Sequence, residues 1–398
     1  MAELDEFAEA LFGQLVVETD EEKQIADLAE RIRDDAEFDV SFTGLEDAAG
    51  RIFPEMRKRL AGFPGMGVQG EISIELASLR DFKLLKGRKV FTDKDSRGFV
   101  DGLFEAVADA DAGALVGLIR RDLAKYLVYS TYAIQYLSRI STTYGDFLDG
   151  KIYLNDFILS SYPQIILYRQ GQPFKARFGG VESGYMGALK MTILEELIHS
   201  QQDPLHRMNT EAAIQVNSIN EELAGIIIGL EDETASSLYE HMQLQEVPDD
   251  FPVAKRANLF FMLNPDNFIV NVLGPDVMTY DRIEIDPEIS RMVPELLGVY
   301  QKWLGPIQRH HAAFTTMEGM AGFLVEEILG DDPDFQAYLG SFMGTDMSSY
   351  RVRKDMGRDF TRSVHEKLGA GTFEMLLNSP PNTKELKDPA RYLGRVGS

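Results

Sequence analysis

The chain has 398 residues, of which 44% are hydrophobic and 26% charged, so it is long and apolar enough to bury a large core. Its formal net charge of -24 argues against a nucleic-acid partner, because such binding depends on Lys and Arg side chains that neutralise phosphates. The absence of cysteine excludes disulfides, thiolate metal sites and cysteine nucleophiles, so a metal must be held by carboxylates and the 6 histidines.

No segment has the pattern of a membrane anchor or a secretion signal. The apolar runs fall short of the roughly 18 residues that a membrane span needs, and the N-terminus is acidic rather than basic. We therefore expect a cytoplasmic protein with neither a membrane nor a nucleic-acid partner. A peptide or protein substrate is compatible with the sequence, which does not predict the oligomeric state.

Residues 1–145 are expected to form an N-terminal helical region. Apolar side chains recur at helical spacing in residues 3–17, 21–35 and 45–60. Residues 71–85 fit a strand and a helix equally well. Residues 112–148 form a long apolar helical stretch with a stripe of tyrosines, which is typical of a helix in the core.

After residue 145 the pattern changes to short strands followed by helices. Alternating apolar side chains predict strands at residues 151–155, 164–169 and 174–180, and a further candidate strand at 267–273. The central helix is expected over residues 185–202, and Asp203-Pro204 ends it. Further helices are predicted at residues 209–244, 286–303, 315–329 and 350–368, with residues 305–311 as the connection between the second and the third.

The central helix carries the clearest chemical pattern, Met191-Thr-Ile-Leu-Glu-Glu-Leu-Ile-His-Ser-Gln-Gln202. Glu195 and His199 are four residues apart, so on a helix they lie on one face, one turn apart, with Glu196 beside them. This is the spacing of H-E-x-x-H, in which the first and last residues bind a metal and the second is a general base. Glu195 takes the place of the first histidine.

Three segments together resemble the gluzincin metallopeptidases over roughly residues 150–393. The first is Glu195-Glu-Leu-Ile-His199. The second is Glu318-Gly-Met-Ala, which is similar to the E-G-x-A helix that brings the third metal ligand in that family. The third is the tail, with Met356-Gly-Arg-Asp-Phe-Thr, Ser379-Pro-Pro-Asn-Thr-Lys-Glu and Asp388-Pro-Ala-Arg-Tyr-Leu.

The resemblance implies an α+β, predominantly helical fold. Residues 146–398 would form a zincin-like domain with a small sheet, an active-site helix and a C-terminal helical cap, packed on the N-terminal region 1–145. It also implies that Glu195, His199 and Glu318 hold a metal and that Glu196 is the catalytic general base. Zn²⁺ is the metal implied by the family, whereas a second carboxylate shifts the preference towards Mn²⁺ or Fe²⁺.

The departure at position 195 has a chemical consequence. Family members with histidine there use two imidazoles and one carboxylate, whereas this chain would use one imidazole and two carboxylates. The added negative charge neutralises the divalent cation, weakens it as a Lewis acid and acidifies its water less.

Two other ligand choices compete with this set. Glu221 and Glu222 follow His199 at a distance common in gluzincins, so either could replace Glu318 as the third ligand. His310 and His311 could supply a fourth ligand or an oxyanion donor. They are equally compatible with an exposed pair at a helix start.

Two interpretations need no peptidase. Glu195 and His199 could form a simple pair on one helix face without a metal. Glu196-x-x-His199 could be one half of a ferritin-like di-iron site, but no second such half occurs.

The function predicted first is that of a metal-dependent peptidase-like hydrolase. The alternative is a catalytically inactive zincin relative that acts as a binding or scaffold protein. A metal-binding protein without hydrolytic activity is a third reading.

Overall fold

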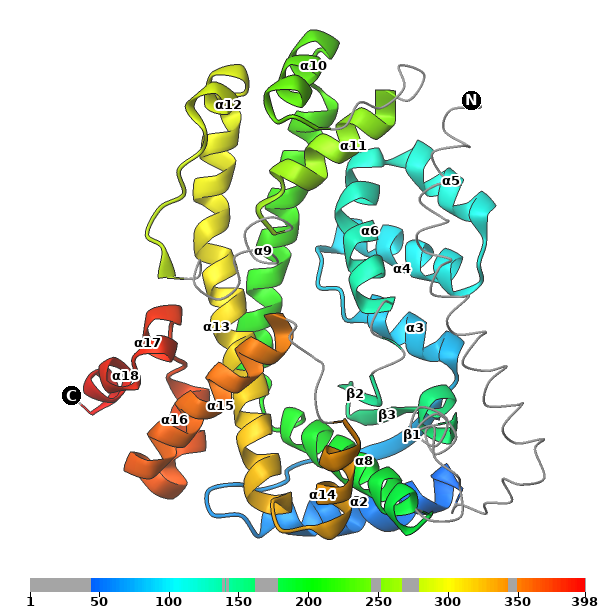
Figure 1. Ribbon diagram of the computed structural model, residues 1–398, viewed down its shortest axis with the longest axis vertical. Helices are drawn as coiled ribbons and strands as arrows, with labels where there is room; N and C mark the ends of the chain where they lie inside the picture. Colours follow the sequence, from blue (N-terminus) through cyan, green and yellow to red (C-terminus); the bar gives the residue numbers. More distant parts are fainter. Residues whose placement is uncertain are drawn as a thin grey trace.

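The computed structural model describes residues 44–137, 140, 143–161, 178–244, 252–266, 279–342 and 349–397 (Figure 1). It is predominantly helical with one small sheet, which confirms the predicted α+β class. The helices predicted at residues 3–17 and 21–35 and the strands predicted at 164–169 and 267–273 lie outside the described residues.

A three-stranded mixed sheet has the strand order β1-β3-β2. β1 (Ser73–Ala77) runs parallel to β3 (Lys151–Asn155), and β2 (Gly145–Leu148) runs antiparallel to β3. The β2–β3 hairpin turns through Asp149 and Gly150, both at positive φ, as a two-residue type I′ turn requires. The strand predicted at residues 151–155 is therefore β3.

Four helices follow β1, and capping side chains explain where three of them begin. They are α3 (Leu79–Arg88), α4 (Lys94–Ala108), α5 (Ala112–Arg121) and α6 (Leu123–Leu137). The side chains of Ser78, Asp93 and Asp111 accept hydrogen bonds from backbone N–H groups in the first turns of α3, α4 and α5. Tyr126 and Tyr129 of α6 are buried in the shared core, as their helical spacing predicted.

The remaining helices extend from the sheet to the C-terminus. They are α2 (Leu45–Ala61), α8 (Phe178–His199), α9 (Asp203–Ile228), α10 (Asp232–His241), α11 (Pro252–Leu263), α12 (Pro287–Met292), α13 (Glu295–Leu329), α14 (Pro333–Phe342), α15 (Ser349–Leu368), α16 (Thr372–Asn378), α17 (Thr383–Lys387) and α18 (Pro389–Val396), with the 3₁₀ turn η6 (Gly369–Gly371) before α16. The long helices α9 and α13 lie side by side and form the spine of the molecule (Figure 1).

Several predicted helix boundaries are wrong. The helical stretch predicted at residues 112–148 is divided into α5 and α6, and its last residues, 145–148, form the strand β2. The helix predicted at residues 286–303 is divided into α12 and the start of α13. The connection predicted at residues 305–311 is helical instead, because α13 runs for 35 residues with Pro306 inside it. A proline removes one helical hydrogen bond, but Pro306, its neighbour Ile307 and the nearby Trp303 are buried, and this packing holds the helix. Conversely, the helix predicted at 209–244 is interrupted at Gly229, which divides it into α9 and α10.

Two large apolar cores lie along the α9–α13 spine. One joins α3 to α6 with the second half of α9, α10, α11 and the start of α13. The other joins α2, β3, α8, the second half of α13 and α15 to α18. The candidate site lies in the second core, where α8 packs against the second half of α13.

Glycines allow the closest helix crossings around this site. A Cβ on Gly319 of α13 would lie 2.1 Å from the backbone of Gly357 of α15, so these two helices touch backbone to backbone. A Cβ on Gly187 of α8 would lie 2.0 Å from the carbonyl oxygen of Asp334 in α14. Gly319 belongs to the Glu318-Gly-Met-Ala segment, and its physical role is this close approach.

Some predictions touch these elements only in part. The strand predicted at residues 174–180 overlaps the start of α8, where residues 178–180 are helical. The division between residues 1–145 and 146–398 stays a prediction, although β1 from the first part pairs with β3 from the second. None of the helices in the described ranges is long and apolar enough to cross a membrane.

Candidate metal centre

The helix α8 is apolar on nearly every side and lies inside the second core. Ile193, Leu194, Leu197 and Ile198 are fully buried. A helix in such surroundings cannot leave charged side chains without partners, because an unpaired buried charge is strongly unfavourable. The three ionisable groups at its end must therefore find partners on neighbouring elements.

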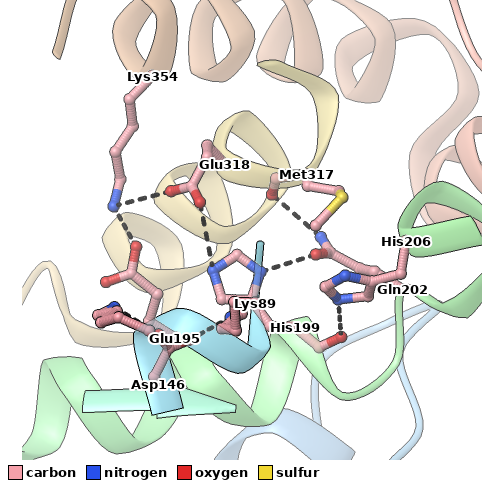
Figure 2. Close-up of polar contacts among 10 residues, drawn as sticks. Lys89, Asp146, Glu195, His199, Gln202, His206, Met317, Glu318 and Lys354 are labelled. Atoms are coloured by element: carbon pink, nitrogen blue, oxygen red, sulfur yellow. Dashed lines mark hydrogen bonds and ion pairs between the residues drawn. The ribbon is translucent and has the colours of Figure 1, made fainter. Parts of the chain in front are cut away.

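Glu195, His199 and Glu318 come together as the sequence resemblance implied. One ligand atom from each residue lies within 4.8 Å of the corresponding atoms of the other two. His199 Nε2 is 3.8 Å from Glu318 Oε1, and both residues are only 9% exposed (Figure 2). Glu318 reaches this point from α13, more than 100 residues away along the chain. The structure thus forms a buried Glu-His-Glu cluster that could hold a divalent metal ion.

Gln202 fixes the orientation of the His199 ring. The Gln202 amide Nε2 donates to the carbonyl oxygen of Met317 at 3.1 Å, so its Oε1 faces His199 Nδ1 at 2.9 Å. An amide oxygen only accepts, and Nδ1 therefore carries a proton. In the neutral ring, Nε2 then presents its lone pair towards Glu318. This is the support that metal-binding histidines commonly have behind them.

The charges around His199 also favour a cation at Nε2. Burial opposes protonation of the ring, but the negative charges of Glu318, Glu196 and Glu195 outweigh it and raise the pKa of His199 above its usual value. A divalent metal would take the place of that proton on Nε2. The donor set of one imidazole and two carboxylates therefore fits a divalent cation in chemistry, burial and orientation.

Glu196 follows Glu195 on α8 and lies beside the cluster. Its side chain is buried, and burial raises its pKa to about 7, with His199 and Lys89 opposing the shift. A carboxylate with a pKa near neutrality can accept and return a proton under cellular conditions. Glu196 is thus suited to acid–base chemistry on electrostatic grounds.

A second group of charges lies behind Glu196. Asp146 of β2 is buried and pairs with both Lys86 and Lys89 at the end of α3. Burial opposes ionisation of Asp146, but the two ammonium groups hold its pKa well below the usual range. Burial likewise opposes the charge on Lys89, yet Asp146 and Glu196 raise its pKa. This group keeps a fixed positive charge near Glu196.

Lys354 of α15 brings another cation directly to the cluster. Its Nζ donates to Glu195 Oε1 and lies 3.7 Å from Glu318 Oε2 (Figure 2). The side chains of Glu195 and Lys354 are 14% and 26% exposed. Glu195 is therefore paired with Lys354 rather than with His199 alone.

The other candidate ligands lie elsewhere. Glu221 accepts hydrogen bonds from Ser96, Lys125 and Tyr129, and the exposed Glu222 pairs with Lys302 at 2.7 Å. Neither belongs to the Glu195, His199 and Glu318 cluster. The third candidate ligand of the cluster is therefore Glu318.

His310 and His311 are not an exposed pair at a helix start, because both lie within α13. His311 is buried, and its Nδ1 faces the Arg353 guanidinium at 2.6 Å. Burial and the charge of Arg353 lower the pKa of His311 well below its usual value and that of His310 to about 4. Neither residue is part of the cluster.

His206 extends the network on the other side of His199. Its Nε2 donates to the carbonyl oxygen of His199 at 3.0 Å. Burial and the nearby charges of His199 and Lys89 lower the pKa of His206 to about 4, so it is neutral. His206 thus supports the last turn of α8.

Sequence reasoning missed Gln202, Lys354, Asp146 and Lys89. The spacing His199-x-x-Gln202 is a local clue to the first, because residues three apart meet at a helix end. The other three come from α15, β2 and the end of α3, and their approach depends on the tertiary fold. No local pattern could have identified them.

The chain matches no protein-family model, no curated protein and no solved structure. The likeness to gluzincins therefore stays a resemblance, carried by the three sequence segments and by the Glu-His-Glu cluster.

Proposed function

We propose that this protein is a metal-dependent hydrolase that acts on the amide bonds of a peptide or protein. The observation that carries this proposal is the convergence of Glu195, His199 and Glu318 from two helices in a buried cluster. Only this set joins three potential ligand atoms within the described ranges. The zincin fold assignment is part of the same proposal and is supported by the order of the sequence motifs.

The residues of the site would have separate roles. Glu195, His199 and Glu318 would hold the cation, and Gln202 would keep His199 in the tautomer that exposes Nε2. A divalent metal held there would polarise the scissile carbonyl and acidify a water. Zn²⁺ is expected from the resemblance, and Mn²⁺ or Fe²⁺ from the oxygen-rich donor set.

Glu196 would act as the general base. Its carboxylate would accept a proton from the attacking water and return it to the leaving amine nitrogen. The burial that raises its pKa to about 7 makes both transfers feasible near neutral pH. Lys89 lies close enough to Glu196 to stabilise the ionised form before the proton is taken.

A conservative variant tests this assignment. Glu196→Gln should abolish cleavage of a mixture of quenched-fluorescent peptides while it retains the metal content of the wild type, measured by plasma mass spectrometry. The matched control is Glu327→Gln, which removes an exposed charge from α13. Full peptide cleavage by Glu196→Gln would refute the role of Glu196.

The ion pair of Lys354 favours a second candidate function. An ammonium group bridging Glu195 and Glu318 already compensates part of their charge. The protein would then be a zincin-like binding or scaffold protein that works without a metal. Wild-type protein that binds no Zn²⁺, Mn²⁺ or Fe²⁺ under saturating conditions would favour this function over hydrolysis.

A further inference from the structure

We propose that Glu195 and Lys354 act as one unit that replaces a neutral imidazole in the metal centre. In this arrangement Lys354 stays beside the bound cation and restores the positive charge that Glu195 would otherwise remove. This role rests on the proposed function, because it concerns the same cation. It makes Lys354 a positioning residue that determines the charge of the site.

The atoms that Lys354 contacts leave its partners able to face a cation as well. Lys354 Nζ lies against Glu195 Oε1 and 3.7 Å from Glu318 Oε2, whereas His199 Nε2 faces the other oxygen of Glu318, Oε1, at 3.8 Å. The ammonium and the imidazole thus approach opposite oxygens of Glu318. Because each carboxylate has two oxygens, one can accept from Lys354 while the other binds the metal.

The helix crossing is shaped to bring Lys354 to this position. Gly319 and Gly357 let α13 and α15 touch. One turn along α13, a Cβ on Gly322 would lie 3.5 Å from Cε and 3.8 Å from Cγ of Lys354, so the aliphatic stem runs along this glycine. Figure 2 shows the side chain extended from α15 towards both carboxylates. The ammonium therefore reaches the site along a surface that glycines keep open.

The charges explain why a lysine belongs there. A divalent cation bound by two imidazoles and one carboxylate keeps one net positive charge. A second carboxylate, from Glu195, removes that charge and weakens the cation as a Lewis acid. The Lys354 ammonium, in contact with the same carboxylate, restores it. The Glu195–Lys354 pair is neutral as a whole, as an imidazole is.

The competing explanation is that Lys354 fills the site and must leave when a cation binds. The two explanations predict different responses to removal of the ammonium. If the pair persists, Lys354→Met changes the metal affinity little while Glu195 is present and much when Glu195 is replaced by histidine. If the cation must break the pair, the larger change occurs with Glu195 present.

A double-mutant cycle in the metal-free protein tests the pair itself. The variants are Glu195→His, Lys354→Met and the double variant, compared by urea unfolding after removal of metal with a chelator. Each single variant should lower the unfolding midpoint, and the double variant should recover most of the loss, because it leaves no unpaired charge from this pair. Additive losses would show that the two residues do not act as a unit.

The same four proteins, titrated with Zn²⁺ alone and then Mn²⁺ alone by calorimetry, test whether Lys354 stays. In the protein with Glu195, Lys354→Met should raise the association constant for the metal less than about tenfold. In the Glu195→His background, where the ammonium has lost its carboxylate, Lys354→Met should raise this constant more than about tenfold. The matched control is Arg362→Met, which removes an exposed α15–α13 ion pair to Glu326 and should leave the constant unchanged.

The outcomes separate this inference from the proposed function. If Lys354→Met raises the association constant more in the protein with Glu195 than in the Glu195→His background, the inference is overturned and the hydrolase proposal stays intact. Wild-type protein that binds neither ion would contradict the proposed function and, with it, a place for Lys354 beside a cation. Binding by the wild type with the expected order of gains supports both.

Discussion

Two polar clusters lie along the α9–α13 spine, and they treat their carboxylates differently. Near one end, Glu195, Glu196 and Glu318 gather around one imidazole. Further along the spine, Asp266 accepts hydrogen bonds from Asn220 of α9 and from Trp303 of α13, whereas the first cluster joins α8 to α13. The first cluster places three carboxylates around one imidazole. In the second cluster a single carboxylate accepts hydrogen bonds from an amide and an indole.

The difference shows what distinguishes a candidate site from a structural polar cluster. Asp266 and Glu221 each accept hydrogen bonds from side chains of the protein, and among the described residues neither belongs to a group of three potential metal ligands. Glu195 and Glu318 converge with a histidine that is held in the metal-binding tautomer. Convergence of acceptor atoms, rather than burial of carboxylates, points to a cation.

The largest effect on stability is expected at the helix crossing that brings Glu318 and Lys354 together. Gly319→Ala places a methyl group 2.1 Å from the backbone of Gly357, so α13 and α15 must separate. We expect a loss of about 3 kcal/mol in the free energy of unfolding, together with weaker binding of Zn²⁺, measured by urea unfolding and calorimetry. The second polar cluster lies outside this crossing, so the Trp303 environment should persist in the folded fraction.

The matched control for the crossing is Gly298→Ala in the same helix. A Cβ at Gly298 meets no atom within 4 Å of the described structure, so alanine should stabilise α13 by about 0.5–1 kcal/mol. Equal losses from the two alanine variants would mean that helix propensity, not close approach, controls the effect.

The next largest effect is expected at Gln202, which orients the His199 imidazole without being a candidate ligand itself. Gln202→Leu removes the acceptor that holds His199 Nδ1–H, and we expect the association constant for Zn²⁺ to fall about 10- to 100-fold. Calorimetric titration measures this change. Gln201→Leu removes a neighbouring amide that bonds to Gln69 and Ser200 instead, and it should leave metal binding intact. An unchanged constant in Gln202→Leu would remove the case for tautomer control.

The smallest effect concerns pH and the second cluster. Burial raises the pKa of Asp266 from the usual 3.8 to about 6, so the protonated form is favoured in the folded protein. The protonated carboxyl of Asp266 therefore stabilises the folded protein fully below about pH 4. The free energy of unfolding then falls as pH rises through 6, by on the order of 2 kcal/mol for a partly buried group. Asp266→Asn should therefore gain stability relative to the wild type between pH 4 and 7.

Urea unfolding of both proteins across this pH range measures the difference. Asn220 can rotate its amide to accept from an asparagine at 266, because Asn220 Oδ1 is buried with no partner among the described residues. Glu196 also has a raised pKa, but it titrates in both proteins and cancels in the comparison. A pH-independent difference between the two proteins would contradict the pKa assigned to Asp266.

The sequence predicts the local part of the candidate site and much of the fold. Helical spacing identifies α8 with Glu195, Glu196 and His199, alternation identifies β3, and the Glu318-Gly segment identifies the third candidate ligand. These features follow from residues a few positions apart. The connection predicted at residues 305–311 is helical instead, because burial of the residues around Pro306 outweighs the lost hydrogen bond.

The rest of the site depends on contacts that no local pattern contains. Lys354 lies 159 residues from Glu195 along the chain, and Asp146 belongs to β2, so only the packing of α15 and β2 brings these side chains to α8. Gln202 is the exception, since its position three residues after His199 could have suggested a hydrogen bond to the ring. Charge partners of a buried site are thus the part that the sequence predicts least.

The metal content of matched variants tests the central claim most directly. Wild type, Glu318→Ala and Glu221→Ala are loaded with Zn²⁺, dialysed and measured by plasma mass spectrometry. We expect about one ion per chain in the wild type and in Glu221→Ala, and loss of the ion in Glu318→Ala, because only Glu318 belongs to the cluster. Equal metal content in the two variants, or none in the wild type, would contradict a metal centre at Glu195, His199 and Glu318.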